Sequence, residues 1–263
     1  MIDAGINARA IAGQWAHNYP DQPDRHSELG SGYGLEAYPN MSRMDWAVEL
    51  FQWFNYYLKD IGDEPEPMVQ IQTNDGRWHV EDTWPPEDMT WNLADIGTDW
   101  MVTGDTVNGQ GASVTLVSGE LTELTHISGL PTLHLEVTTQ ACQGGQIFAT
   151  LYDNEDNLRL GHATMDVRYR DGGYDAKATS PFSSYTMLME FNPLDVVVPA
   201  GHTLRIELTE NGEDYLPSPC ASNPLGGLTV DGGVVGLPII DRPKSHDSWF
   251  LAPPWWEQQP IPE

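Results

Sequence analysis

The chain has 263 residues, 40% of them hydrophobic, which is enough for one large domain or for a short segment followed by one domain with a buried core. Its 39 acidic and 12 basic residues give a formal net charge of −27. This charge disfavours nucleic acid as a partner, because phosphate contacts need lysine and arginine.

The first 62 residues are predicted to form a strand, a long loop and a helix. The strand covers 9–15, and the loop that follows it, to residue 40, is rich in Pro, Gly, Asp and Ser. Apolar residues recur at near-helical spacing over 44–59, with Ser42 as the expected N-cap and Gly62 as the expected stop. Prolines and acids over 63–67 then favour an extended, solvated linker.

Residues 63–263 are predicted to be mainly β. Alternating polar and apolar side chains, separated by Gly, Pro, Asn and Asp turns, indicate strands at 69–72, 113–117, 133–138, 146–151 and 203–208. Such a series is typical of a β sandwich or jelly roll. The domain boundary is therefore expected between residues 62 and 63.

An ordered series of short motifs runs along the chain. It begins with the apolar segment 9–17, which ends in a turn that presents His17. The later motifs are Met44-Asp45-Trp46, the helical segment 49–60, Gly76-Arg77-Trp78, Trp84-Pro85-Pro86, Arg159-Leu160-Gly161-His162 and Arg168-Tyr169-Arg170-Asp171. The series resembles the X-prolyl dipeptidyl-peptidase and cocaine-esterase group of serine hydrolases. Members of this group end their catalytic domain in a Gly-Pro-Trp-x-His turn and a helix, followed by a C-terminal jelly roll of galactose-binding type.

The resemblance implies a fold and a role for this chain. It implies a strand-helix remnant of an α/β-hydrolase domain over 1–62 and a galactose-binding-like jelly-roll sandwich over 63–263. It also implies that His17 is the general base of the intact enzyme, which takes the proton of the serine. Two departures are Gln14, where the family has proline, and Asp60-Ile61-Gly62 in place of a direct Lys-Gly ending.

The nucleophile and the acid of the triad precede the histidine in α/β-hydrolases, so both are expected before residue 1. The expected function is therefore that of the C-terminal region of a serine hydrolase acting on X-prolyl peptides, acyl esters or amides, inactive alone. A local nucleophile is not expected, because Leu29 stands where an elbow around Ser31 needs its first glycine. We interpret 30–34 as a flexible glycine loop.

A rival interpretation is a stand-alone binding or interaction module without activity. Tryptophan faces stack on sugar rings, so the aromatic residues leave a carbohydrate-binding role open. The alternative is that these rings pack against the hydrolase body or clasp a neighbouring subunit. The tryptophans concerned are Trp84, Trp91, Trp100, Trp249, Trp255 and Trp256.

No cofactor and no metal site are expected. The histidines lack zinc-ligand spacing, and His162 is expected to pair charges within the jelly roll. The acidic run 153–157 has hard oxygen ligands but lacks the glycine and closing glutamate of a calcium loop, so a solvated hairpin tip is favoured. The sequence leaves open whether Cys142 and Cys220 form a disulfide between two loops or stay free thiols.

Surface composition and the N-terminus bear on the setting of the protein. With 39 acids and only three lysines, Lys59, Lys177 and Lys244, the surface favours a halophilic source, where salt screens self-repulsion. No apolar stretch reaches the length of a membrane span, so no membrane partner is expected. No signal peptide is recognisable at the N-terminus, which favours a cytoplasmic location. The apolar stripe of the helix at Phe51, Phe54 and Leu58 predicts self-association or docking onto the jelly roll.

Overall fold

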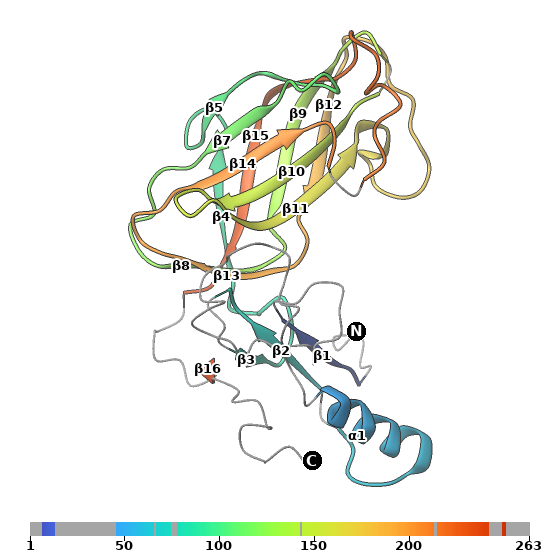
Figure 1. Cartoon of the computed structure of the whole chain (residues 1–263), viewed down its shortest axis with the longest axis vertical. Coiled ribbons are helices and arrows are strands. Elements are labelled where there is room, and N and C mark those ends of the chain that lie inside the picture. The colour runs from blue at the N-terminus through green and yellow to red at the C-terminus, as the bar shows by residue number, and fades with distance from the viewer. Residues whose placement is uncertain are drawn as a thin grey trace, which may run out of the picture. The chain divides into compact units, whose positions relative to one another are not determined.

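The computed structural model describes residues 7–13, 46–65, 67–74, 78–142, 144–212, 215–241 and 249–250 (Figure 1). The chain divides into two compact units. The first unit comprises 1–88, 195–197 and 241–263, and the second comprises 89–194 and 198–240. The chain is mainly β, and its second unit is a sandwich of two sheets, as expected from the sequence. The boundary between residues 62 and 63 stays a prediction.

The second unit contains nearly all the strands. In chain order they are β4 (Thr90–Asp95), β5 (Met101–Thr103), β6 (Thr106–Val107), β7 (Val114–Val117), β8 (Thr125–Gly129), β9 (Thr132–Thr139), β10 (Gln146–Asp153), β11 (Leu158–Asp166), β12 (Ser184–Glu190), β13 (Leu194–Val198), β14 (Leu204–Thr209) and β15 (Leu228–Ile239). Residues 195–197 of β13 belong to the first unit. One sheet has the order β11-β10-β14-β7-β5, and the other has the order β12-β9-β15-β8-β13, with β4 and β6 also paired to β15.

Strand alternation builds the core of this unit. In the five-stranded sheet, Ile147 and Leu151 of β10 and Ile206 of β14 are at most 1% exposed. In the other sheet, Leu133 and Leu135 of β9 are fully buried. Successive side chains of a strand point to opposite faces, so Phe148 and Thr150 of β10 lie on the face opposite to Ile147 and Leu151, where they are also largely covered. The predicted strands at 113–117, 133–138, 146–151 and 203–208 are therefore confirmed as β7, β9, β10 and β14.

The first unit holds a small sheet of order β1-β2-β3-β16. Its strands are β1 (Arg9–Ala12), β2 (Met68–Gln72), β3 (Trp78–Glu81) and β16 (Trp249–Phe250). β1 and β2 are parallel, and the helix α1 (Trp46–Lys59) lies between them in the sequence, as a parallel connection requires. Arg9 of β1 pairs with Glu49 of α1 at 3.0 Å.

The C-terminus of α1 differs from the expected glycine stop. Asp60 takes the left-handed conformation directly after the helix, with φ of 57°, and its N–H donates to the carbonyl of Tyr56. The N–H of Ile61 donates to the carbonyl of Asn55. Gly62 also has a positive φ, of 89°, but it lies beyond these bonds. Asp tolerates this conformation better than most residues, so the helix ends at Lys59, directly before Asp60. The expected N-cap Ser42 lies outside the described residues.

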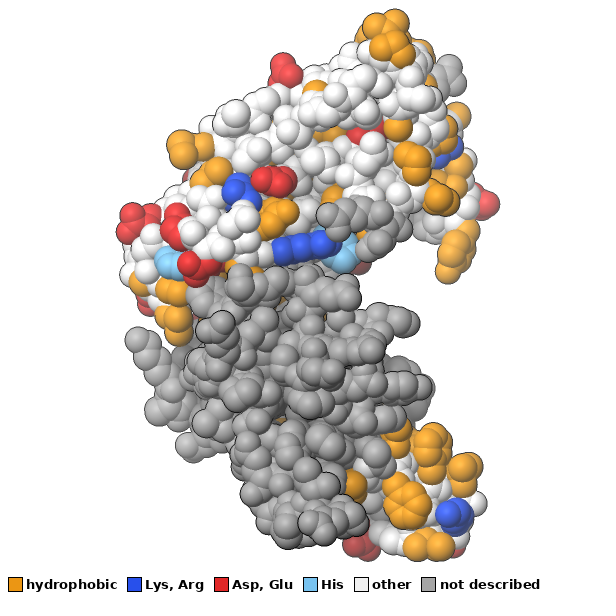
Figure 2. Space-filling model, in the orientation of Figure 1, with side chains coloured by type: hydrophobic (Ala, Val, Ile, Leu, Met, Phe, Trp, Pro, Cys, Tyr) orange, Lys and Arg blue, Asp and Glu red, His pale blue; other side chains and the backbone are white. Residues whose placement is uncertain are grey.

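One face of α1 is apolar and exposed. Phe51 is 62% exposed, Phe54 is 50% exposed and Leu58 is 75% exposed. Figure 2 shows hydrophobic side chains gathered over this helix. These residues are spaced by three and four, so they share one side of the helix. Within the described residues, no helix is both long and apolar enough to span a membrane.

Candidate functional site

The two residues weighed as catalytic, His17 and Ser31, lie outside the described residues. The strand that precedes His17 in the sequence is formed as β1. The catalytic role of His17 therefore stays a prediction. The chemistry that the structure does describe lies in a buried histidine of the first unit and in a polar and aromatic surface of the second.

The pKa of His79 is shifted strongly from its ordinary value. It lies on β3, and Glu81 follows it by two residues, so both side chains are on one face of the strand. The Nδ1 atom of His79 is 2.8 Å from Glu81 Oε1, and its Nε2 atom is 3.1 Å from Asp195 Oδ2. The imidazole is fully buried between two carboxylates.

The charge state of His79 follows from these contacts. Burial disfavours the charged imidazole, but hydrogen bonds with Asp195 and Glu81, and the charges of both carboxylates, raise the pKa of His79 from 6.5 to about 9. The ring therefore carries its proton at neutral pH and cannot take up another one. Its role is to hold β3 to Asp195 within the first unit, rather than to act as a general base. Sequence analysis did not single out His79; the Trp78-His79-Val80-Glu81 alternation signals the Glu81 contact, whereas Asp195 lies 116 positions away in the printed sequence.

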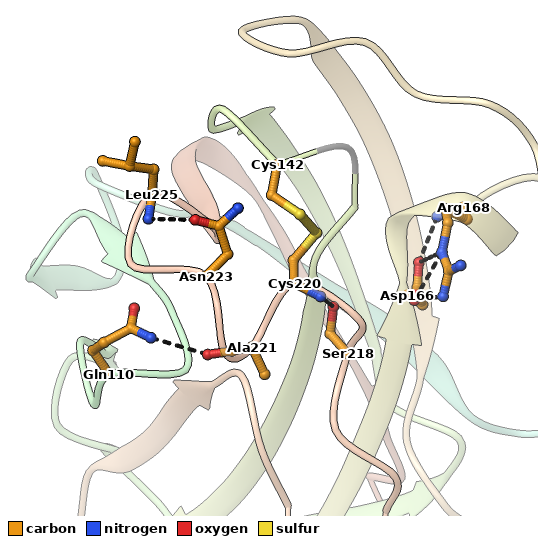
Figure 3. The surroundings of a disulfide bond; sticks show 9 residues. All are labelled: Gln110, Cys142, Asp166, Arg168, Ser218, Cys220, Ala221, Asn223 and Leu225. Carbon is orange, nitrogen blue, oxygen red and sulfur yellow. Dashed lines mark hydrogen bonds and ion pairs between the residues drawn. A yellow bond between two sulfur atoms is a disulfide. The ribbon is translucent and has the colours of Figure 1, made fainter.

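Cys142 and Cys220 form a disulfide with a Cα–Cα distance of 5.9 Å. Of the two alternatives that the sequence left open, a disulfide or two free thiols, the disulfide is therefore confirmed. Figure 3 shows the surrounding polar contacts. The N–H of Cys220 donates to Ser218 Oγ at 3.1 Å, and Gln110 Nε2 donates to the carbonyl of Ala221 at 3.0 Å. The disulfide and these bonds fix the long connection between β14 and β15 to the loops before β7 and β10.

The acidic run 153–157 forms the turn between β10 and β11, as expected, but its acids are not simply solvated. Asp153 is fully buried, and both of its carboxylate oxygens lie 2.9 Å from His202 Nδ1. Glu155 accepts from the N–H and the hydroxyl of Thr203, and the backbone bond lowers the pKa of this carboxyl. The turn is thereby tied to the start of β14.

A metal ion could in principle use Asp153, Asp156 and His202, whose ligand atoms lie within 4.8 Å of one another. However, the hydrogen bonds with Asp153 and the negative charges nearby raise the pKa of His202. When His202 is protonated, it forms an ion pair with Asp153. A metal would have to displace that proton.

His162 of β11 has polar contacts with Tyr215 and Asn192, and the charge pairing expected for it stays a prediction. Its Nε2 atom lies 3.1 Å from the hydroxyl of Tyr215, and its backbone N–H donates to Asn192 Oδ1 at 2.6 Å. The nearby Arg168 instead binds Asp166 of its own strand end, at 2.6 Å. His162 also stacks on Phe148, with ring centroids 5.6 Å apart. Sequence analysis missed Phe148 and Tyr215, because their proximity to His162 depends on strand pairing.

The tryptophans differ in their exposure to solvent. Trp100 is 2% exposed and belongs to the core, so it cannot stack on a sugar. Trp91, on β4, is 46% exposed. Trp255 and Trp256 lie outside the described residues. Among the tryptophans whose burial the structure describes, Trp91 is the exposed one, so the carbohydrate-binding role stays a prediction.

Comparison with known proteins supports the expected family. Residues 99–225 match the X-Pro dipeptidyl-peptidase C-terminal non-catalytic domain. A curated Bacillus anthracis protein named as an Xaa-Pro dipeptidyl-peptidase is 24% identical over 91% of this chain and 44% of its own length. A Streptomyces avermitilis protein of the same name is 22% identical over 88% of this chain. The chain thus spans less than half the length of the curated relatives that it matches.

Solved structures show the same fold. A CocE/NonD family hydrolase from Staphylococcus aureus aligns over 90% of this chain and 55% of its own, with a TM-score of 0.55 and 13% identity. An aminopeptidase from a marine sediment Thaumarchaeota archaeon aligns over 73% of this chain and 44% of its own, with a TM-score of 0.57 and 14% identity.

Proposed function

We propose that this chain, whose residues 99–225 form a C-terminal non-catalytic domain of the X-Pro dipeptidyl-peptidase type, is the C-terminal region of a serine hydrolase and has no hydrolase activity alone. The family match over the jelly roll is the observation that carries the proposal. By resemblance, the intact enzyme acts on X-prolyl peptides, acyl esters or amides. His17 is its general base.

The first unit supports this proposal in two ways. β1 lies at the edge of its sheet and is joined to β2 in parallel through α1, which is the connection found in α/β folds. The exposed side of α1 carries Phe51, Phe54 and Leu58, and an apolar helix face of this kind covers a sheet in such folds. A hydrolase sheet that continued beyond β1 would explain both features.

The acidic surface supports a second, separate element of the proposal. The net charge of −27 with three lysines suits concentrated salt, where repulsion between carboxylates is screened over about 3 Å at 1 M. We therefore propose a halophilic source. A cytoplasmic setting and self-association through α1 remain further parts of the proposal.

A hydrolysis assay tests the central part. The whole chain is offered p-nitrophenyl acetate and a Gly-Pro anilide, beside Ser31→Ala and the matched control Ser27→Ala. We expect all three proteins to give the rate of buffer, because a histidine without a serine nucleophile to activate cannot form the acyl intermediate of the serine-hydrolase reaction. Turnover that Ser31→Ala abolishes and Ser27→Ala preserves would show a nucleophile in this chain and overturn the proposal.

A further inference from the structure

A group of aromatic and basic side chains surrounds Phe148 on the outer face of the five-stranded sheet. We call Phe148, Arg159, His162 and Tyr215 the Phe148 cluster. The ring centroid of Phe148 is 5.6 Å from that of His162 and 5.4 Å from that of Tyr215, and the Cζ atom of Arg159 is 6.0 Å from it. The cluster therefore joins one guanidinium, one imidazole and one phenol around a single ring.

A β-bulge brings the two polar members from β11 to this face. Tyr152 of β10 is opposite Arg159, and Thr150 is opposite His162, whereas the pairing shifts by one residue between them. Without the shift, residues three apart on one strand would point to opposite faces. Bulges of this kind redirect side chains and are frequent beside functional sites. β10 and β11 lie side by side in Figure 1.

Arg159 differs from the other arginines of the described residues in its partners. Arg9 has Glu49 at 3.0 Å, Arg168 has Asp166 at 2.6 Å and Arg205 has Glu207 at 3.3 Å. Within the described parts of the chain, no hydrogen bond or ion pair involves Arg159, and its Nε atom is buried without an acceptor. Leaving a half-buried guanidinium without an anionic partner costs free energy of folding. The chain has 39 acidic residues, yet none of those that the structure describes pairs with Arg159.

We propose that the Phe148 cluster binds a small molecule that carries a carboxylate next to a flat apolar group. The guanidinium fork of Arg159 matches the two oxygens of a carboxylate, and the hydroxyl of Tyr215 provides a further donor when His162 Nε2–H donates to its oxygen. Tyr215 is 39% exposed, so its ring is open to the apolar part of the ligand. The bond between Tyr215 and His162 holds the phenol in place. This inference does not depend on the proposed function.

The test follows the arginine Nε–H resonances of the whole chain by NMR while phenylacetate is added at low ionic strength. The buried Nε of Arg159 exchanges slowly with water, so its signal can be observed and is assigned from its loss in Arg159→Lys. We expect phenylacetate to shift this signal with saturation. Acetate, which has no ring, and phenylacetamide, which has no charge, should each bind about 10-fold more weakly, the scale of one lost charged or apolar contact.

Variants separate the site from general anion binding. Arg159→Lys should weaken phenylacetate binding by about 10-fold or more, because lysine cannot offer the bidentate fork. Arg170→Lys is the matched control, since Arg170 also stacks on a tyrosine, with its Cζ atom 4.4 Å from the ring centroid of Tyr185, but donates to the carbonyl of Val167. This variant should leave binding unchanged. Tyr215→Phe keeps the ring and should weaken binding by about 3–10-fold.

Three results would overturn the inference. The first is an unsaturated shift of all arginine signals together. The second is equal binding of inorganic phosphate, acetate and phenylacetate, which would indicate a surface that attracts any anion. The third is equal loss of binding in Arg170→Lys and Arg159→Lys. Thermal melting of each variant excludes unfolding as the cause, and Tyr215→Phe keeps the test decisive if Arg159→Lys does not fold.

Discussion

The ionic contacts of His79 make a quantitative prediction about stability and pH. In the folded chain the pKa of His79 is raised from 6.5 to about 9 by its two carboxylate partners, against the opposing effect of burial. A rise of this size corresponds to about 3 kcal/mol of stabilisation of the protonated, folded state. The side chain is fully buried, so solvent screens little of this effect.

The direction of the pH dependence follows from the raised pKa. The contribution is present in full below about pH 6.5, where the unfolded chain also binds the proton. It decreases as the pH rises between about 6.5 and 9, because the folded chain then holds a proton that the unfolded chain has lost. It is absent well above about pH 9, where the folded imidazole is neutral.

Replacing His79 with glutamine removes the charge and leaves Glu81 and Asp195 buried without it. We expect urea unfolding to show a free energy of unfolding lower by about 3 kcal/mol at pH 6, with the difference from the native chain shrinking toward zero near pH 10. His134→Gln is the control, since His134 is exposed on β9 and should change little. The reasoning is refuted if the imidazole signal of His79 titrates near 6.5, or if the difference between the chains does not vary with pH.

Three further outcomes can be measured on the same protein. Reducing the Cys142–Cys220 bond should lower the free energy of unfolding by about 2–4 kcal/mol, because it closes a loop of 78 residues; equal urea midpoints with and without reductant would contradict this. The melting temperature should rise from about 0.1 M to about 2 M NaCl if screening relieves repulsion among carboxylates, and a flat response would remove the halophile proposal. Sedimentation should show self-association that Leu58→Glu reduces and Gln52→Glu on the same helix leaves intact; a monomeric native chain would disprove the role of the stripe.

The strands that the sequence predicted carry alternating polar and apolar residues. β9 keeps this alternation in its burial, with Leu133 and Leu135 buried, whereas β10 is buried continuously over 147–151. The short strands β5 and β6 gave no such signal, because two or three residues cannot show a period. The predicted helix end at Lys59 is confirmed, but Asp60, and not Gly62, takes the left-handed conformation directly after it.

The contacts of His79 and His162 could not be predicted from the sequence. The partner of His79 across the fold, Asp195, is distant in the chain, and so is the partner of His162, Tyr215. The bulge that turns Arg159 to the outer face depends on the pairing of β10 with β11, which no local pattern specifies. Sequence motifs therefore pointed to the family that the comparisons match and to the mainly β fold, whereas tertiary pairing determined which side chains meet.

The central claim is that this chain is the non-catalytic C-terminal part of a serine hydrolase and carries no activated serine. Intact-mass spectrometry after incubation with a fluorophosphonate tests this claim most directly, because the reagent bonds only to serines activated by a base. We predict that the mass of the chain does not change. One stoichiometric adduct, mapped to Ser31 and lost in the presence of a Gly-Pro anilide, would contradict the account.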